Sequence, residues 1–554
     1  MKFYLNISLV CAFALIRTCA LGQTAPTHVY DDKLYQFLEE LNTADFTDQT
    51  FIAKPLNNQE VSNILFGIDT LKILNKVLKQ RLQYYKQMYA LEHAASYPTP
   101  TKLYEKPLHT LSRFKAIDVA YYGEDRVAFT LNPIIGLDVF TNQNGQIIRR
   151  KIGGEFKMYI DKFTIYGSVR DHYESVPYTT YTSIGPHEGS LYKYNPDGSV
   201  EFSETRGGVS YNLGWGEIAF AKDHLKWGYG RFGTNILDAS VPSFPHLKLR
   251  LYPKPWIRFE YVHAALQSNV LDSSSIYTIG GVNRGEFHNK FLASNLLSFR
   301  LKEKTWISLG NSIVYSQQNI EPAYLIPLAF YKSIDHYVAN RNNYSGSNAQ
   351  MFGAFSTRII PKTHLYATLF VDEVSFRRMF DAQRHSNWYS INAGAQISNV
   401  LPNTTFNVEY LHTNAMVYKH FIETTTYSNS YYTMGHYLGD NARQVGLQLT
   451  YSPLWWIDLS ASYQFAQKGP DIKDDRVTKD PETGILLVQG IKLLDTTAWQ
   501  RNLYQFKAVL SPLAKWQFSC ALRVQSQPVI NRNYDIDFYS GNNSTFVIGL
   551  SYNY

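Results

Sequence analysis

The chain has 554 residues, enough for several ordinary domains or one large barrel, and 15% of them are aromatic, with 42 Tyr and 9 Trp. The formal net charge of +7 is small for this length and argues against a nucleic-acid-binding protein. Tyr and Trp combine an apolar ring with a polar tip, so their abundance suits a protein that places rings at a membrane surface.

The N-terminus resembles a secretory signal. A basic residue precedes an apolar run over residues 3–16, and small residues follow at Ala20 and Gly22. We therefore expect cleavage between Gly22 and Gln23, which removes residues 1–22 and exports the chain.

Cysteine usage agrees with this prediction. Cys11 and Cys19 leave with the signal, so Cys520 alone remains and we expect no internal disulfide. A lipoprotein signal at Cys19 is the weaker alternative, because Arg17 and Thr18 are a poor approach to a lipidated cysteine.

Three helices are predicted in residues 23–95, which we expect to form a small periplasmic domain. The second starts at Asn57 or Asn58, and the third runs from about Thr70 to Leu91. Basic residues on the other faces of the third helix suit a solvated surface, with a membrane-lying helix as the alternative. The apolar residues at helical spacing are, in chain order, Leu34, Phe37, Leu38 and Leu41; Val61, Ile64 and Leu65; and Leu71, Leu74, Leu78, Leu82, Tyr85 and Tyr89.

Residues 96–114 contain prolines and are predicted to be a linker. After it the hydrophobic period changes to two. No later apolar stretch reaches the ~18–20 residues that a spanning helix needs, so the chain can enter a membrane only as a closed barrel. We predict an all-β transmembrane barrel of about 18 antiparallel strands over residues 115–554, preceded by the small N-terminal α-helical domain.

The connections between strands favour an outer-membrane barrel over a soluble sandwich. Several turns are very short, whereas the segments 265–290, 414–440 and 466–500 are long and polar. Short turns at one end and long loops at the other are typical of outer-membrane barrels. A Trp follows each of four short turns, where an interfacial aromatic girdle belongs: Trp256, Trp306, Trp456 and Trp516.

The last strand carries a further signal. Apolar and aromatic residues alternate up to the final residue, at Phe546, Ile548, Leu550, Tyr552 and Tyr554. This resembles the terminal strand that the barrel insertion machinery of the outer membrane reads. We therefore expect outer-membrane lipid and that machinery as partners, in the outer membrane of a Gram-negative cell.

Several short motifs carry a family resemblance. They are LYQFLEEL at 34–41 with KPL at 54–56, FTLNPI at 129–134, KWGYG at 226–230 with NILDAS at 235–240, YLIPLAFY at 324–331 and LFVDE at 369–373. Together they resemble the capsule-assembly Wzi-like family of outer-membrane proteins, especially its Bacteroidota-type members, which include gliding-motility-associated proteins. The family's Arg after the Lys-Pro pair is absent, because Leu56-Asn57-Asn58 stands there, and this leaves the helical contact open.

The resemblance implies a monomeric barrel closed by loops and a periplasmic helical bundle. In the capsule branch it implies a surface lectin that retains polysaccharide on the cell. The residues themselves show no catalytic, metal or cofactor constellation, so we expect no enzyme, metal or cofactor. The function is then attachment or assembly of surface polysaccharide by binding. The alternatives are a partner of a gliding or secretion apparatus, docked through residues 23–95, and a porin-like solute channel.

Two features are candidate binding residues. Asp372 and Glu373, with Arg377 and Arg378, carry charges of both signs where a strand enters a loop. We favour a staple that holds a loop over the lumen, with contacts to saccharide hydroxyls as the alternative. The loop tyrosines, including Tyr427, Tyr431, Tyr432 and Tyr437, suit either a glycan surface or packing among loops.

Overall fold

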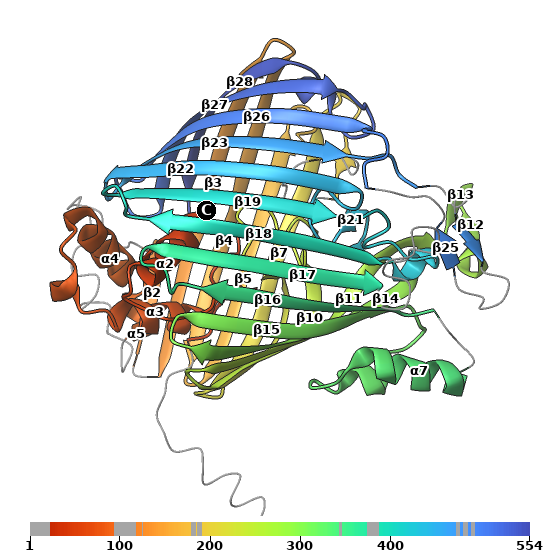
Figure 1. Ribbon diagram of the computed structural model, residues 1–554, viewed down its shortest axis with the longest axis horizontal. Coiled ribbons are helices and arrows are strands. Elements are labelled where there is room, and N and C mark those ends of the chain that lie inside the picture. Colours follow the sequence, from red (N-terminus) through yellow and green to blue (C-terminus); the bar gives the residue numbers. More distant parts are fainter. Residues whose placement is uncertain are drawn as a thin grey trace, which may run out of the picture.

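The computed structural model describes residues 23–93, 118–124, 126–178, 184, 191–342, 346–373, 387–472, 477–479, 486–488 and 493–553. The predicted signal, residues 1–22, and the predicted linker, residues 96–114, lie outside the described residues. Two regions of structure follow one another along the chain, a group of short helices and then a barrel (Figure 1).

Eighteen long strands form a closed antiparallel barrel in the part of the chain that the structure describes. The last strand, β28, pairs with the first long strand, β3, with Ile548 opposite Val139, and β2 (Ala120–Gly123) extends the wall beside β3. The predicted fold is confirmed. The long strands are β3 (Val127–Asn142), β4 (Gly145–Ile160), β5 (Phe163–Glu174), β7 (Val200–Asn212), β8 (Gly216–Asp223), β10 (Phe244–Lys254), β11 (Ile257–Leu271), β14 (Phe287–Lys302), β15 (Thr305–Tyr315), β16 (Asn348–Thr357), β17 (Thr363–Glu373), β18 (Trp388–Ser398), β19 (Thr404–Thr413), β22 (Ala442–Leu454), β23 (Ile457–Lys468), β26 (Trp499–Leu510), β27 (Trp516–Val529) and β28 (Asn543–Tyr552).

The two ends of the barrel differ in their connections. At one end, here called the turn end, the strands are joined by short turns such as 161–162, 303–304 and 455–456. At the other end, here called the loop end, long segments such as 224–243 and 414–441 connect the strands. The short turn between β3 and β4 is an exception at this end. This asymmetry is the one predicted from the spacing of turns and polar segments.

The outward face of the wall is apolar. Along β28, Phe546, Ile548 and Leu550 are each 43–46% exposed, and on β15 Leu309 is 59% exposed. Exposed aliphatic side chains repeated around a closed ring are the surface that a lipid bilayer covers. None of the helices in the described residues is long and apolar enough to cross a membrane.

The first two helices form as predicted. α2 (Asp32–Thr43) buries Leu34, Phe37, Leu38 and Leu41 completely. α3 (Asn58–Phe66) begins after Asn57, whose side chain accepts a hydrogen bond from the backbone N–H of Glu60 and so caps the helix.

The third predicted helix is interrupted. Residues Thr70–Lys72 form a short 3-10 turn, α4 begins at Lys76 after the capping residue Asn75, and α5 (Ala90–His93) follows α4 (Lys76–Met88). The predicted stripe is wrong at its start, because Leu71 and Leu74 are 82% and 97% exposed. The break before α4 turns these two residues away from the core that buries Leu78 and Leu82.

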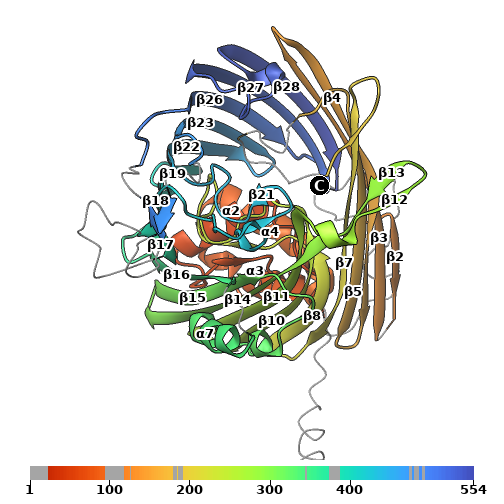
Figure 2. The same cartoon turned by 90° about the vertical axis from the view of Figure 1, so that its right-hand side faces the viewer.

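The helical domain closes the turn end of the barrel. Figure 1 places α2 to α5 at that end, and Figure 2, which looks into the loop end, shows α2, α3 and α4 within the ring of strands. Ion pairs join the domain to the inward face of the wall: Glu39 to Arg358 at 2.6 Å, Glu60 to Arg258 at 2.5 Å and Arg250 at 3.1 Å, Asp48 to Arg300 at 3.0 Å, and Lys33 to Asp458 at 3.2 Å.

Substitution of Glu60 tests whether its ion pairs hold the helical domain in the barrel. Glu60→Gln leaves the buried guanidinium groups of Arg250 and Arg258 without their shared anion. Because breaking a buried pair costs roughly 3–5 kcal/mol, we expect the helical domain to loosen. Trypsin should then cut α4 several-fold faster in detergent-purified protein. The matched control is Lys193→Met, which removes the exposed Lys193–Glu201 pair and should leave the cleavage rate unchanged. Equal rates for Glu60→Gln and the parent chain would contradict the docking role.

Candidate ligand-binding site

A loop from the loop end passes into the lumen and meets the helical domain. Residues 224–243 connect β8 to β10, and their short strand β9 (Lys226–Trp227) pairs with β1 (Ala53–Lys54) of the helical domain. The backbone N–H of Gly228 also donates to the carbonyl oxygen of Ile52 at 2.7 Å. The helical domain and this loop, together called the lumen plug, therefore form one body that extends from the turn end into the barrel.

Apolar side chains fill the space around the lumen plug. Leu225, Trp227 and Ile236 of the inserted loop are buried against inward residues of the wall such as Phe352 and Phe370. A second loop, residues 414–441, closes over them. The hydroxyl of Tyr418 donates to the carbonyl oxygen of Asn235 at 2.8 Å, and that of Tyr427 donates to the carbonyl oxygen of Ile236 at 2.9 Å. This half of the lumen is a packed core.

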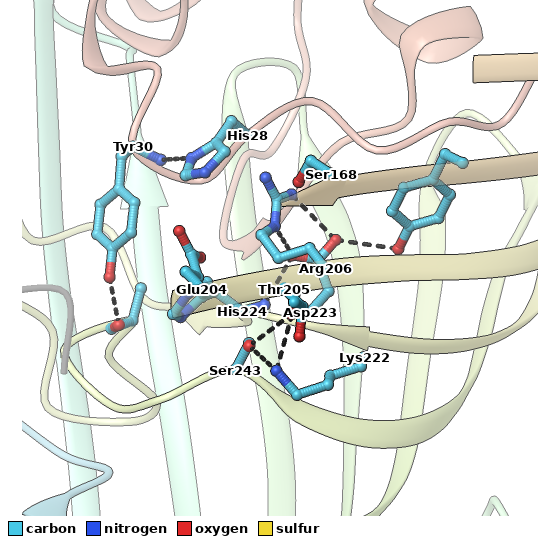
Figure 3. Close-up of polar contacts among 12 residues, drawn as sticks. His28, Tyr30, Ser168, Glu204, Thr205, Arg206, Lys222, Asp223, His224 and Ser243 are labelled. Carbon is cyan, nitrogen blue, oxygen red and sulfur yellow. Dashed lines mark hydrogen bonds and ion pairs between the residues drawn. The ribbon is translucent and has the colours of Figure 1, made fainter. Parts of the chain in front are cut away.

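A cluster of charged side chains on β7 and at the end of β8 lies beside His28 and Tyr30 of the N-terminal segment of the plug (Figure 3). Arg206 makes two bonds to Asp223, at 2.5 and 3.1 Å, and Nε2 of His224 lies 2.6 Å from Glu204. His28 packs beside them. Its burial, followed by the nearby arginines including Arg206, holds the pKa of His28 well below its ordinary value, so the ring stays neutral.

The same cluster borders a notch in the barrel wall. β8 ends at Asp223 opposite Phe244, where β10 begins, whereas the flanking strands β7 and β11 continue toward the loop end as far as Val200 and Leu271. Two adjacent strands are therefore shorter than their neighbours. The chain that leaves β8 turns into the lumen instead of extending the wall.

A pocket of about 430 Å³ occupies this notch, and we call it the loop-end pocket. Phe202, Phe244 and Phe287 line it, together with the polar side chains of Glu204, Lys222, Gln267, His288 and Asn429. Nζ of Lys222 donates to the carbonyl oxygen of Thr205 at 2.8 Å and to the hydroxyl of Ser243 at 2.6 Å (Figure 3). An ammonium group has three protons, so these two bonds leave one donor on Lys222, which lines the pocket.

A larger cavity, of about 650 Å³, lies at the turn end between the helical domain and the wall. Its charged lining is mostly paired within the protein: Lys33 with Asp458, Arg81 with Glu40 at 2.7 Å, and Lys515 with Asp118 at 2.6 Å. The Lys33–Asp458 pair joins the helical domain to the wall, so the cavity is part of the docking interface between them. The loop-end pocket is the stronger candidate for an external ligand.

The predicted staple residues fall into two groups. Oδ2 of Asp372 accepts a hydrogen bond from the backbone N–H of Tyr418 at 2.8 Å and ties the end of β17 to the loop 414–441. The predicted staple of charges of both signs stays a prediction. Glu373 ends the same strand and is exposed. Arg377 and Arg378 lie outside the described residues, and glycan binding by any of the four stays a prediction.

The loop tyrosines divide in a similar way. Tyr427, Tyr432 and Tyr437 are buried at 1%, 4% and 9% exposure, which is packing among loops. Tyr431 is 52% exposed on the outer surface of the same loop. A glycan contact at Tyr431 stays a prediction.

The structure contradicts the predicted aromatic girdle at one of its four residues, Trp306, and the girdle role of the other three stays a prediction. Trp256 and Trp516 lie at the turn end with 49% and 39% exposure, and Trp456 is half-buried in its turn. Trp306 is completely buried and its ring N–H donates to Asp48 of the helical domain at 3.2 Å. Trp306 faces the lumen, so it is a docking residue for the plug.

Both termini are predicted to carry signals, an export signal at the N-terminus and a barrel-insertion signal in the last strand. In β28 the apolar residues of the predicted terminal signal face outward, with Tyr552 at 9% exposure beside Trp516, and Tyr554 lies outside the described residues. Gly22 is outside them too. Gln23 is 1% exposed, and its side chain donates to the carbonyl oxygen of Leu91 at 3.0 Å. Cleavage before Gln23 stays a prediction.

The pocket residues were not singled out from the sequence. Glu204 and Arg206 stand two apart in a strand, which places them on the same face, and this was the available signal. Charges at that spacing also line any water-filled barrel. Only the pairing of β7, β8 and β10 brings Glu204, Lys222 and Ser243 together.

Comparisons with known proteins support the fold. No protein-family model and no curated protein sequence matches the chain. The chain is similar in structure to Wzi, an outer-membrane protein involved in group 1 capsule assembly in Escherichia coli and described as a carbohydrate-binding β-barrel. The TM-score is 0.57 at 11% identity, over 96% of this chain and 100% of that one. The resemblance to the Bacteroidota-type branch stays a prediction.

Two further barrels align more weakly. OpdK of Pseudomonas aeruginosa, solved with vanillate, aligns with a TM-score of 0.41 at 8% identity, over 77% of this chain and 98% of that chain. OccAB2 of Acinetobacter baumannii aligns at 0.42 and 7%, over 76% and 97%. These scores are too low to support an argument about this chain.

Lys54 provides a pH test of the plug. Burial, then the neighbouring ammonium of Lys226, lowers the pKa of Lys54 to about 8, against the opposing charges of Glu39 and Asp32 and with a further lowering by Arg231. Between pH 8 and the ordinary value of 10.5 the unfolded chain binds more protons than the folded one, so stability rises with pH across this window.

Lys54→Met should abolish that rise and stabilise the protein at pH 7 by about 2–3 kcal/mol. The measurement is the guanidinium chloride midpoint of parent and variant from pH 7 to 10 in detergent. Parallel pH profiles for the two proteins would show that Lys54 stays charged in the folded state.

Proposed function

We propose that this protein lies in the outer membrane of a Gram-negative cell, with its loop end outward, and holds surface polysaccharide by binding. The observation that carries the proposal is the loop-end pocket, which combines three phenylalanine rings with charged and amide side chains at a notch in the wall. Export by the predicted signal and assembly by the barrel insertion machinery are parts of the same proposal.

The chemistry of the pocket suits a glycan. A sugar ring presents C–H groups on its faces and hydroxyl groups at its edge, so it is bound by an aromatic face with polar groups around it. Phe287 is 47% exposed and offers such a face, and Phe244 is a buried residue of the pocket lining. Lys222 and His288 also line the pocket, and the ammonium of Lys222 favours hydroxyl or carboxylate oxygens of a polysaccharide.

The lumen plug favours binding over conduction. A solute channel needs a continuous aqueous path, whereas Trp227, Ile236 and Phe370 belong to a buried core that spans this half of the lumen. The whole-length likeness to a barrel described as carbohydrate-binding supports the same choice. We expect purified protein to give no stable porin-like conductance in planar bilayers.

Phe287→Ala is the direct test of the pocket. We expect the variant to bind surface polysaccharide isolated from the cell about tenfold more weakly, equivalent to roughly 1.4 kcal/mol, because the exposed ring face is lost. The measurement is a titration of detergent-purified protein. Phe421→Ala is the matched control, since Phe421 is an exposed loop-end phenylalanine outside the pocket lining.

Three outcomes are distinguishable in this titration. Loss of affinity in Phe287→Ala with no change in Phe421→Ala supports the pocket. An equal loss in both variants would place binding on the loops at large. Absence of binding by the parent chain would overturn the proposed function.

A second candidate is docking to a periplasmic partner, as expected for a gliding or secretion apparatus. Leu71 and Leu74, almost fully exposed on the helical domain at the turn end, favour it. Two exposed leucines that lie three residues apart on a polar domain are typical of a contact surface. A photo-crosslinker placed at position 74 of the full-length protein in cells should capture one specific partner, and a control crosslinker at exposed Gln83 should not.

A further inference from the structure

One region of the outward barrel face is not exposed. Tyr261 on β11, Ala293 and Asn295 on β14, and Ile313 and Tyr315 on β15 are at most 6% exposed. By alternation these residues share the outward face with exposed Leu301 and Leu309, whereas Arg300 and Trp306 point inward to Asp48. Something therefore covers the outer wall here.

The cover is a part of the loop between β15 and β16, residues 320–338, which we call the outer-wall segment. It contains a 3-10 turn (Pro322–Leu325) and the start of α7 (Tyr331–Asn342). Both views place α7 outside the ring of strands, next to β15 (Figures 1 and 2). Tyr324, Tyr331 and Val338 are buried against the wall, so this external loop folds back along the outside of the barrel.

Hydrogen bonds fix the segment to polar side chains of the wall. Nδ2 of Asn295 donates to the carbonyl oxygens of Pro327 and Ala329 at 3.0 and 2.8 Å. Nδ2 of Asn311 donates to the carbonyl oxygen of Ala329 at 3.1 Å, and its Oδ1 accepts from the backbone N–H of Tyr331 at 2.8 Å. The carbonyls of Pro327 and Ala329 and the N–H of Tyr331 thus have hydrogen-bond partners on the barrel side.

The opposite side of the segment is apolar. Leu325, Ile326, Leu328 and Phe330 are 42%, 52%, 71% and 50% exposed. They lie near exposed Leu309 of the wall, because Asn311, two residues further along the same face of β15, bonds the backbone of Ala329 and Tyr331. Four large apolar side chains in six residues on one outer face need an apolar neighbour.

The height of the segment on the barrel identifies that neighbour. Asn295 lies six residues from Leu301, the last outward residue before the turn. At the usual rise and tilt this is about 20 Å along the strand and about 15 Å along the barrel axis, within an apolar band that is ~25 Å tall. The segment therefore lies at the level of the leaflet nearer the loop end.

We propose that the apolar run of the outer-wall segment, residues 325–330, is inserted in the outer leaflet, with Leu325, Ile326, Leu328 and Phe330 among lipid acyl chains. Continuity with the lipid-facing wall selects lipid as the occupant. The bilayer excludes backbone groups that lack hydrogen-bond partners, and the amides of Asn295 and Asn311 meet this requirement for the carbonyls of Pro327 and Ala329. The segment widens the protein's contact with the outer leaflet on one side of the barrel.

The test is depth-dependent quenching in phosphatidylcholine proteoliposomes. Leu328→Cys is made in a Cys520→Ser background and labelled with an environment-sensitive fluorophore, and doxyl-labelled phosphatidylcholine is the quencher. Leu309→Cys on the wall is the control for lipid contact. Val282→Cys, exposed in the β12 (Tyr277–Ile279) and β13 (Val282–Arg284) hairpin at the loop end, is the aqueous control.

We expect the label at position 328 to be quenched as strongly as that at 309 and several-fold more than that at 282. Quenching at 328 by aqueous iodide, to the level found at 282, would overturn the proposal. So would a dimer that buries position 328, detected as cross-linking between copies in dilute proteoliposomes, because a second copy would then be the occupant.

A second variant checks the attachment of the segment. Asn295→Leu with Asn311→Leu removes the four hydrogen bonds that hold the backbone of residues 327–331. We expect several-fold faster trypsin cleavage at exposed Lys332 and weaker lipid quenching at position 328, with the barrel itself still resistant to protease. Unchanged quenching and cleavage would show that the asparagines do not hold the segment at this depth.

Discussion

Ion pairs between the helical domain and the inward face of the barrel are the interactions on which the architecture depends. An eighteen-strand ring encloses a wide lumen, and its inward face here carries arginines such as Arg250, Arg258 and Arg358. Glu39 and Glu60 of the helical domain approach these groups within 2.5 to 3.1 Å. Buried charges need such partners, because each is costly when left alone. The small domain and the barrel are thus a single folded unit.

The position of the helical domain determines the shape of the loop end. Because β1 is held inside the lumen, β9 pairs with it and draws residues 224–243 inward. The strands on either side of this loop, β8 and β10, are therefore short, and their neighbours are not. The notch that forms the loop-end pocket adjoins this contact, because β9 begins three residues after β8 ends at Asp223. A change in the docking of the plug is consequently expected to alter the pocket as well.

The sequence predicts the barrel because strand alternation and turn spacing are local properties. It predicts the orientation of individual side chains less well. Trp256 lies within its turn, whereas Trp306 is the second residue of its strand, and a shift of one position moves a side chain to the other face. The third helix shows a similar limit. Leu71 and Leu74 fit the helical period, but the capping side chain of Asn75 starts the helix after them.

The pocket and the outer-wall segment depend on contacts that have no local signature. Glu204 and Ser243 are brought together by two short strands, and the length of those strands depends on the plug. From the sequence, the apolar run from Tyr324 to Tyr331 is as consistent with a buried strand as with an irregular segment on the outer wall. Within the run, Pro327 alone argues against a strand. Its role is set by Asn295 and Asn311, two amides on a wall that otherwise faces lipid. On this part of the wall, the two amides mark the place where another part of the chain covers the outer face.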